Sequence, residues 1–140
     1  MKDFGRPIVR IILHCTASSQ QATVEQIKSY WRNVLKWNQV GYHYLIDTQG
    51  GRHILAHLSE VTNGVYGYNY NSCHISFIGG KGGVDNRTPA QKAEMKRLIQ
   101  ELRSDSILGP IPVFGHNDFT NKKLCPSFDV AKWLKEDNVL

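Results

Sequence analysis

The pattern of apolar and polar positions predicts five short strands. PIVRIILHC is almost entirely apolar and rich in β-branched residues, so we expect a strand from about Ile8 to His14, inside a covered sheet. The segments YHYLID and RHILAHL flank the turn TQGG, which is typical of a hairpin. CHISFIGG and PIPVFG predict two further strands, the last of which leads to His116.

Helical periodicity follows the first strand. In TVEQIKSYWRNVLKW, Thr23 and Gln26 have the spacing of a capping box. The apolar residues of this segment recur at helical spacing: Val24, Ile27, Trp31 and Val34. We therefore expect an amphipathic helix between the first strand and the hairpin.

A second helix is predicted for TPAQKAEMKRLIQELRSD, with Thr88 as N-cap, Pro89 at the first helical position and Gln91 completing a capping box. Its buried stripe is expected to be Met95, Leu98, Ile99 and Leu102. A short closing helix is predicted for FDVAKWLKED, after Pro126. The order β-α-β-β-β-α-β-α predicts an α/β fold with a mixed central β-sheet flanked by helices.

Length and composition favour one globular domain over residues 1–140. No apolar run approaches the roughly 18 residues that a membrane helix requires, so no membrane insertion is expected. Arg10 interrupts the apolar N-terminal stretch and no small-residue cleavage site follows. We therefore expect synthesis in the cytoplasm without a signal peptide. We also expect a monomer.

Charge and cysteine content narrow the partners only slightly. Seventeen basic and twelve acidic residues give a net charge of +5, but the basic residues are dispersed, which favours a solubilising surface over a nucleic-acid footprint.

The three cysteines, Cys15, Cys73 and Cys125, leave at least one unpaired in any intramolecular scheme. A reduced state fits the expected lack of a signal peptide, so each cysteine needs its own explanation.

The candidate chemistry lies at two predicted strand ends. His14 ends the first strand and His116 follows the last, and open sheets of this class bind ligands beyond the carboxyl ends of strands. With Cys125 on the loop that follows, two imidazole nitrogens and one thiolate could hold a tetrahedral zinc and leave one position for water. The spacing also allows three separately structural residues, so spacing alone does not decide between these hypotheses.

Six short motifs resemble a known enzyme family. ILHCTAS, VGYHYLID, GYNYNS, FIGG, TPAQ and CPSFD occur in the order seen in zinc-dependent N-acetylmuramoyl-L-alanine amidases of type 2. That class is similar to phage lysozyme-type amidases and to animal peptidoglycan recognition proteins. The resemblance implies their fold, a bound zinc ion, and hydrolysis of the amide between N-acetylmuramic acid and the L-alanine of the stem peptide.

Residue by residue, the resemblance implies that His14, His116 and Cys125 are metal ligands and that Tyr42 and Lys123 are the catalytic pair. An ammonium held two residues from a ligand would stabilise the oxyanion of the tetrahedral intermediate. The phenolic hydroxyl would orient the attacking water or stabilise the same oxyanion. The sequence does not decide which of the two handles proton transfer.

Two departures from the family pattern affect the site. Cys125 lies nine residues after His116 where close relatives have eight, which indicates a one-residue loop insertion that leaves the lysine-to-cysteine spacing intact. Family members often have a histidine in the segment that matches TNGVYGYN, where this chain has Asn, Gly and Val at positions 63–65. Asn69 and Asn71 are candidates for hydrogen bonds to substrate, or else ordinary turn residues.

The remaining histidines and cysteines are predicted to be structural. His53 and His57 are four apart in a strand-and-turn pattern, so we expect surface residues, because that spacing suits a metal only on a helix. Strand alternation predicts that Tyr42 and Tyr44 share the face opposite His43, and that Cys15 points away from His14. His74 is expected to be structural and Cys73 to be a small buried residue.

Three functions compete at this point. The first is a zinc amidase of the phage endolysin type, which acts on the cell wall after release. The second is a module that binds muropeptides without cutting them, against which Cys125 argues. The third is a nucleic-acid-binding domain, which rests only on charge and tyrosines and would require salt-sensitive binding. We expect peptidoglycan as the partner, and no nucleic acid.

Overall fold

The strands form one mixed sheet with β4 and β1 in its interior. The computed structural model describes residues 3–121 and 123–140. Its strands are β1 (Arg10–Cys15), β2 (Tyr44–Ile46), β3 (Arg52–Ile54), β4 (Ser72–Phe77) and β5 (Val113–Gly115), in the order β3-β2-β4-β1-β5. The hairpin β2–β3 is antiparallel, whereas β1 runs parallel to β4 and β5 and β2 runs parallel to β4. The predicted mixed sheet is confirmed, although β1 begins at Arg10 rather than at Ile8.

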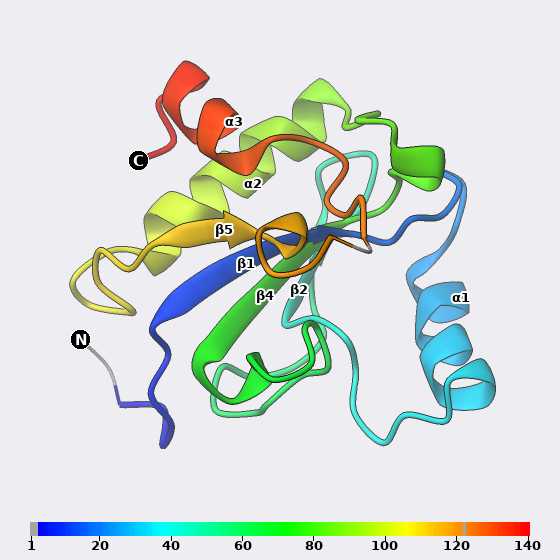
Figure 1. Ribbon diagram of the computed structural model, residues 1–140, viewed down its shortest axis with the longest axis horizontal. Helices are drawn as coiled ribbons and strands as arrows, with labels where there is room; N and C mark the ends of the chain where they lie inside the picture. Colours follow the sequence, from blue (N-terminus) through cyan, green and yellow to red (C-terminus); the bar gives the residue numbers. More distant parts are fainter. Residues whose placement is uncertain (1–2, 122) are drawn as a thin grey trace.

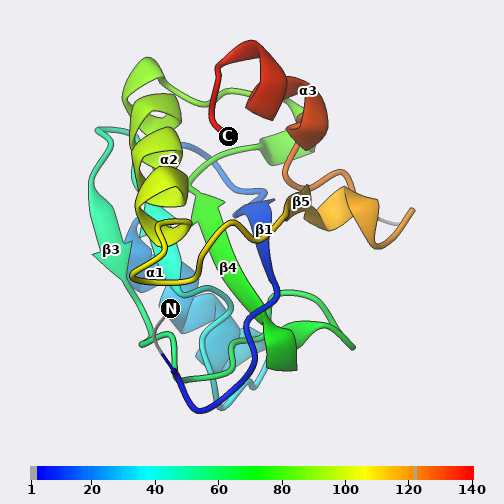
Figure 2. The ribbon, with the colours of Figure 1, turned by 90° about the vertical axis from the view of Figure 1, so that its left-hand side faces the viewer.

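Helices cover both faces of this sheet (Figures 1 and 2). α1 (Val24–Ser29) continues into a π-helical segment, η1 (Tyr30–Val34), on one face. α2 (Pro89–Leu102) and α3 (Val130–Glu136) lie on the other. Short 3-10 turns occupy Asn69–Asn71 (η2), Lys81–Gly83 (η3) and His116–Asp118 (η4). Among the described residues, no helix has the length and apolar character needed to cross a membrane.

Both predicted capping boxes are present. The Thr23 and Thr88 side chains accept hydrogen bonds from the backbone N–H groups of Gln26 and Gln91. In return, the two glutamine side-chain oxygens accept hydrogen bonds from the backbone N–H groups of these threonines. Gln91 is fully buried, and its amide nitrogen also donates to the carbonyls of Ile46 (3.2 Å) and Ile78 (3.0 Å). The start of α2 is therefore tied to the end of β2 and to the residue that follows β4.

The two faces of the sheet differ in chemistry. The face under α2 and α3 is apolar and includes the predicted stripe of α2; its strand and helix residues include Ile11, Leu13, Cys15, Cys73, Ile75, Phe77, Met95, Leu98, Ile99 and Leu102. The alternate strand positions His14, His74 and Ser76 are also buried. Because successive side chains of a strand point to opposite faces, these polar side chains gather on the face that does not carry the main core.

The predicted alternation of Tyr42 and Tyr44 is wrong. β2 begins only at Tyr44, so the strand geometry does not extend back to Tyr42. Tyr44 packs against the core under α2, whereas Tyr42 packs with Trp31 and Leu45 in a separate cluster under α1. Tyr42 thereby lies on the side of the sheet that carries His14.

His43 is a buried junction between strands. Its backbone N–H donates to the His74 carbonyl (3.0 Å), its carbonyl accepts from Leu55 N–H (2.8 Å), and its ring Nδ1 accepts from His74 N–H (3.0 Å). Burial lowers the pKa of His43 to about 4, and the facing Arg6 guanidinium acts in the same direction. The folded chain therefore holds this imidazole neutral, whereas the unfolded chain protonates it near pH 6.5.

We predict that His43 makes the fold less stable in acid. Its folded pKa is lower than its unfolded pKa, so its stabilising contribution is complete above about pH 6.5 and is lost as the pH falls towards 4. The free energy of unfolding should fall by about 1.4 kcal/mol per pH unit from this residue alone. Urea denaturation between pH 7.5 and 4.5 measures the slope.

The matched comparison is His43→Gln against His57→Gln, since the His57 ring is exposed. The His43 variant should show a shallower dependence on pH whatever its absolute stability, and the His57 variant should follow the parent chain. Parallel curves for the parent and His43→Gln would contradict the assignment.

Candidate active site

Adjacent strand ends bring the two predicted histidines together. His14 is the fifth residue of β1, and His116 opens η4 directly after β5, which lies parallel to β1. Their rings meet edge to face with centroids 5.0 Å apart. Cys125 approaches from the loop before α3, and the candidate ligand atoms of the three residues all lie within 4.8 Å of one another.

The buried His14 ring is held neutral. The side chain is 1% exposed, with Nε2 2.8 Å from His74 Nδ1 and Nδ1 3.8 Å from Cys125 Sγ. Burial, with the neighbouring His74 and His116, keeps the pKa of His14 well below its usual value. The pKa of His116 is also lowered, first by burial and then by the nearby Lys123. Neutral imidazoles are the form that binds metals.

Cys125 completes a donor set that suits zinc. Its sulfur accepts a hydrogen bond from Cys15 N–H (3.1 Å), and its carbonyl accepts from Asn117 N–H (2.8 Å). The hydrogen bond between the Cys125 and Cys15 thiols, together with burial, raises the pKa of Cys125. A bound divalent cation would oppose this effect, because a coordinating thiol is deprotonated. Two imidazoles and one thiolate match the ligand types of catalytic zinc.

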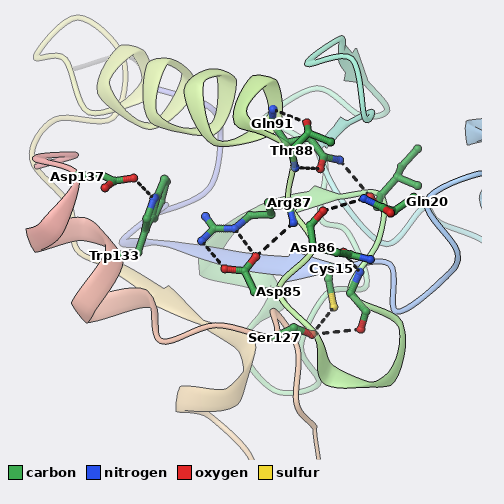
Figure 3. A network of polar contacts seen from close by, with 12 residues as sticks. Cys15, Gln20, Asp85, Asn86, Arg87, Thr88, Gln91, Ser127, Trp133 and Asp137 are labelled. Carbon is green, nitrogen blue, oxygen red and sulfur yellow. Dashed lines mark hydrogen bonds and ion pairs between the residues drawn. The ribbon is translucent and has the colours of Figure 1, made fainter.

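A network of side chains holds the loop that carries Cys125 (Figure 3). Ser127 Oγ donates to the carbonyl of Gly80 (3.2 Å) and lies 3.5 Å from Cys15 Sγ. Asn86 Oδ1 accepts from the Gly80 N–H (2.8 Å), which braces the loop after β4 internally at the residue that Ser127 contacts. The third candidate ligand therefore has a defined position although it lies outside the sheet.

Arg87, in the loop after β4, contacts the residues that follow Cys125 along the chain. Its guanidinium makes two hydrogen bonds to Asp85, at 2.9 and 3.0 Å (Figure 3). The same group lies 3.4 Å from the ring centroid of Phe128 and 4.7 Å from that of Trp133. A planar cation that is hydrogen-bonded to a carboxylate and lies over two aromatic rings joins the loop after β4 to Phe128 and to α3.

Tyr42 lies against the candidate metal ligands. Its hydroxyl donates to the carbonyl of Cys15 (3.2 Å), and its ring contacts His14 and Trp31 at centroid distances of 5.1 and 5.2 Å. Burial, followed by the charge of Cys125, raises the pKa of Tyr42 far above its ordinary value. The hydroxyl therefore remains protonated at neutral pH and can act as a hydrogen-bonding group but not as a phenolate.

A cavity of about 710 Å³ opens over these residues. The exposed Lys123 lines it together with Tyr42 and the three candidate ligands. One wall comes from α1, η1 and the segment after them, with Tyr30, Trp31, Leu35 and Trp37. This aromatic wall was not expected from the sequence, where the same residues appear only as a helical stripe and its neighbours.

The amide oxygens of Asn69 and Asn71 have partners within the protein. Asn69 Oδ1 accepts from Val65 N–H (2.7 Å) and lies 2.9 Å from His74 Nε2, and Asn71 Oδ1 accepts from Arg10 (2.6 Å). Neither asparagine is among the described residues that line the cavity, whereas Asn63 and Gly64 are. The expected substrate contacts of Asn69 and Asn71 stay predictions.

The other histidines and cysteines are largely placed as expected. His57 is exposed, and His53 is paired with Asp47 at 2.8 Å.

Cys73 is fully buried, and burial raises its pKa to about 12. Cys15 packs in the core under α2, and the Cys125 thiol lowers its pKa to about 6. His74 is buried as predicted, but its contact with His14 was missed.

Comparison with known proteins identifies the family. The model of the N-acetylmuramoyl-L-alanine amidase family matches residues 4–128. The endolysins of Enterobacteria phage T3 and Escherichia phage T7 are 34% and 33% identical, each over 93% of this chain and 87% of its own length.

Solved structures share the fold of this chain. The amidase LysC from Clostridium intestinale URNW aligns with a TM-score of 0.77 at 20% identity, over 99% of this chain and 90% of its own. The Apis mellifera peptidoglycan recognition protein PGRP-SA aligns with a TM-score of 0.78 at 27% identity, over 92% and 82%. The chain therefore belongs to the N-acetylmuramoyl-L-alanine amidase family.

Proposed function

We propose that this protein is a zinc-dependent endolysin. It hydrolyses the amide between the lactyl group of N-acetylmuramic acid and the L-alanine of the peptidoglycan stem peptide. One observation carries the proposal: His14, His116 and Cys125 converge beneath a cavity that Tyr42 and Lys123 also line. The amidase family match and the two phage endolysins supply the reaction class.

His14, His116 and Cys125 would hold the zinc ion. When bound, zinc supplies a water whose pKa is lowered to about 7 and a Lewis acid for the scissile carbonyl. The chain's own contribution is orientation, because two ligands lie at strand ends and the third lies on a braced loop. The cavity's aromatic wall excludes part of the solvent, which strengthens charge interactions inside it.

Lys123 and Tyr42 have different roles in this proposal. The Lys123 ammonium stands at the cavity rim and stabilises the negative charge that develops on the carbonyl oxygen. The Tyr42 hydroxyl directs its proton at the Cys15 carbonyl, so its lone pairs remain to accept a hydrogen bond from the attacking water. Tyr42 thus orients the water, and Lys123 acts on the oxyanion.

Cleavage should require zinc, and zinc binding should require Cys125. Digestion of purified peptidoglycan by the zinc-loaded chain should release stem peptides with a free L-alanine amino terminus, detected by mass spectrometry. A chelator should abolish this product, and added zinc should restore it. Cys125→Ser should lose both bound zinc and product, whereas the matched thiol variant Cys73→Ala should keep the zinc stoichiometry of the parent.

The alternatives give different products. Intact polymer that retains the protein would identify a binding module. Cuts elsewhere in the polymer would leave the fold correct and the reaction wrong. Unchanged cleavage in chelator would exclude the zinc mechanism.

Lys123→Met should lower kcat by about a hundredfold to a thousandfold, as expected for losing one oxyanion donor. KM and zinc content should change little, because the ammonium acts mainly in the transition state. Steady-state kinetics on a soluble muropeptide measures both constants. The matched control is Lys132→Met, which removes an exposed lysine of α3. Equal rates for the two variants would remove Lys123 from the mechanism.

A further inference from the structure

We propose that His74 and Asn69 are positioning residues that fix the tautomer of His14, so that its Nδ1 lone pair faces the metal position beside Cys125. The inference rests on the proposed zinc site. It adds two residues to that site, neither of which lines the cavity.

The chain of contacts starts at a backbone amide. Val65 N–H donates to Asn69 Oδ1 at 2.7 Å. Because a backbone N–H only donates, this bond fixes which end of the Asn69 amide is the oxygen. The same oxygen lies 2.9 Å from His74 Nε2. An amide oxygen only accepts, so His74 Nε2 must carry a proton.

The next contact transfers this constraint to His14. His74 is fully buried, and burial favours a neutral imidazole, which carries one N–H. With Nε2 protonated, His74 Nδ1 is an acceptor, and it lies 2.8 Å from His14 Nε2. His14 therefore donates from Nε2, and its Nδ1 is the unprotonated nitrogen. That nitrogen is the one that lies 3.8 Å from Cys125 Sγ.

Holding the second nitrogen of a metal-binding histidine is a known way to orient the ring and raise its basicity. Here the holding group is another histidine, which is itself held twice. Its ring donates to Asn69, and its backbone N–H donates to His43 Nδ1 at 3.0 Å. The His14 ring is consequently fixed in orientation before any metal binds.

Gly64 gives His74 the space that this arrangement needs. A Cβ atom at position 64 would overlap the His74 ring at Nδ1, Cε1 and Cγ. Any side chain at position 64 would therefore displace the His74 ring from its observed position. Gly64 thus makes room for an imidazole that comes from β4.

The tautomers can be observed without zinc or substrate. Long-range ¹H–¹⁵N correlation spectra of the full chain in chelator, at neutral pH, distinguish protonated from unprotonated ring nitrogens. His14 and His74 should each carry their proton on Nε2. A proton on Nδ1 of either ring would overturn the proposal. This measurement decides the proposal even if the protein proves not to be a zinc amidase.

Zinc affinity tests the consequence. Competition against a chromophoric chelator should show about 10-fold to 100-fold weaker binding for His74→Phe, which leaves the Nε2–H of His14 without an acceptor. His74→Gln offers a carbonyl oxygen in its place and should recover much of the affinity. His57→Phe changes an exposed histidine and should bind zinc like the parent chain.

Parent-like affinity in His74→Phe would overturn the positioning role. A parent chain that binds no zinc at all would instead contradict the proposed function, and the tautomer spectra would then stand alone. The two failures are therefore distinguishable.

A double-mutant cycle tests the dependence on Gly64. Gly64→Ala should weaken zinc binding in the parent chain because it displaces the His74 ring. In a His74→Ala background, the same change should have little further effect, since the ring is absent. Equal effects in both backgrounds would show that Gly64 acts independently of His74.

Discussion

The parallel pairing of β1 with β4 and β5 is the constraint on which the site depends. Its register sets His14 opposite Ser76 and His74 opposite Ile12, and it brings the carboxyl ends of β1 and β5 to one edge. Side chains alternate along each strand, so the same register sends the apolar positions to the face under α2 and the histidines to the other face. A slip of one residue would exchange the two sets, so the packing of the core enforces the geometry of the site.

Burying several imidazoles in one region is tolerated because each has a partner. His43 bonds to the backbone of His74, His74 lies between Asn69 and His14, and the rings of His43 and His74 stack at 6.0 Å with an interplanar angle of 12°. Satisfied polar groups of this kind give a unique arrangement, whereas an unpaired one would be costly. Burial also keeps the rings neutral, which is the state required both for ligation and for an ordered chain of donors and acceptors.

The order of elements could be predicted because its signals are local. Capping residues, turn glycines and the apolar stripe of α2 act within a few residues of one another, and the structure confirms them. The proximity of His14 and His116 could be anticipated from strand ends, whereas the choice of Cys125 as their partner needed the family resemblance. The role of His74 could not be anticipated, because it follows from the register between β1 and β4, which joins positions sixty residues apart. Tyr42 was assigned to the wrong face for a related reason: β2 is shorter than its apolar pattern indicates, and packing against Trp31 decides the orientation.

The three candidate ligands are positioned by different physical means, which affects how the site tolerates change. His14 is fixed by hydrogen bonds within the sheet, and His116 follows a strand directly, so both share the stability of the core. Cys125 lies outside the sheet, although its sulfur accepts a hydrogen bond from the Cys15 N–H of β1. Its loop is also held by Ser127 Oγ, which donates to the Gly80 carbonyl, and by Arg87, which stacks on Phe128 and Trp133. The two ends of the loop between His116 and Cys125 are also joined directly, because the Asn117 N–H donates to the Cys125 carbonyl. The residues between these ends can therefore vary in number without moving either ligand. This explains how the one-residue insertion expected from the sequence is compatible with an intact donor set.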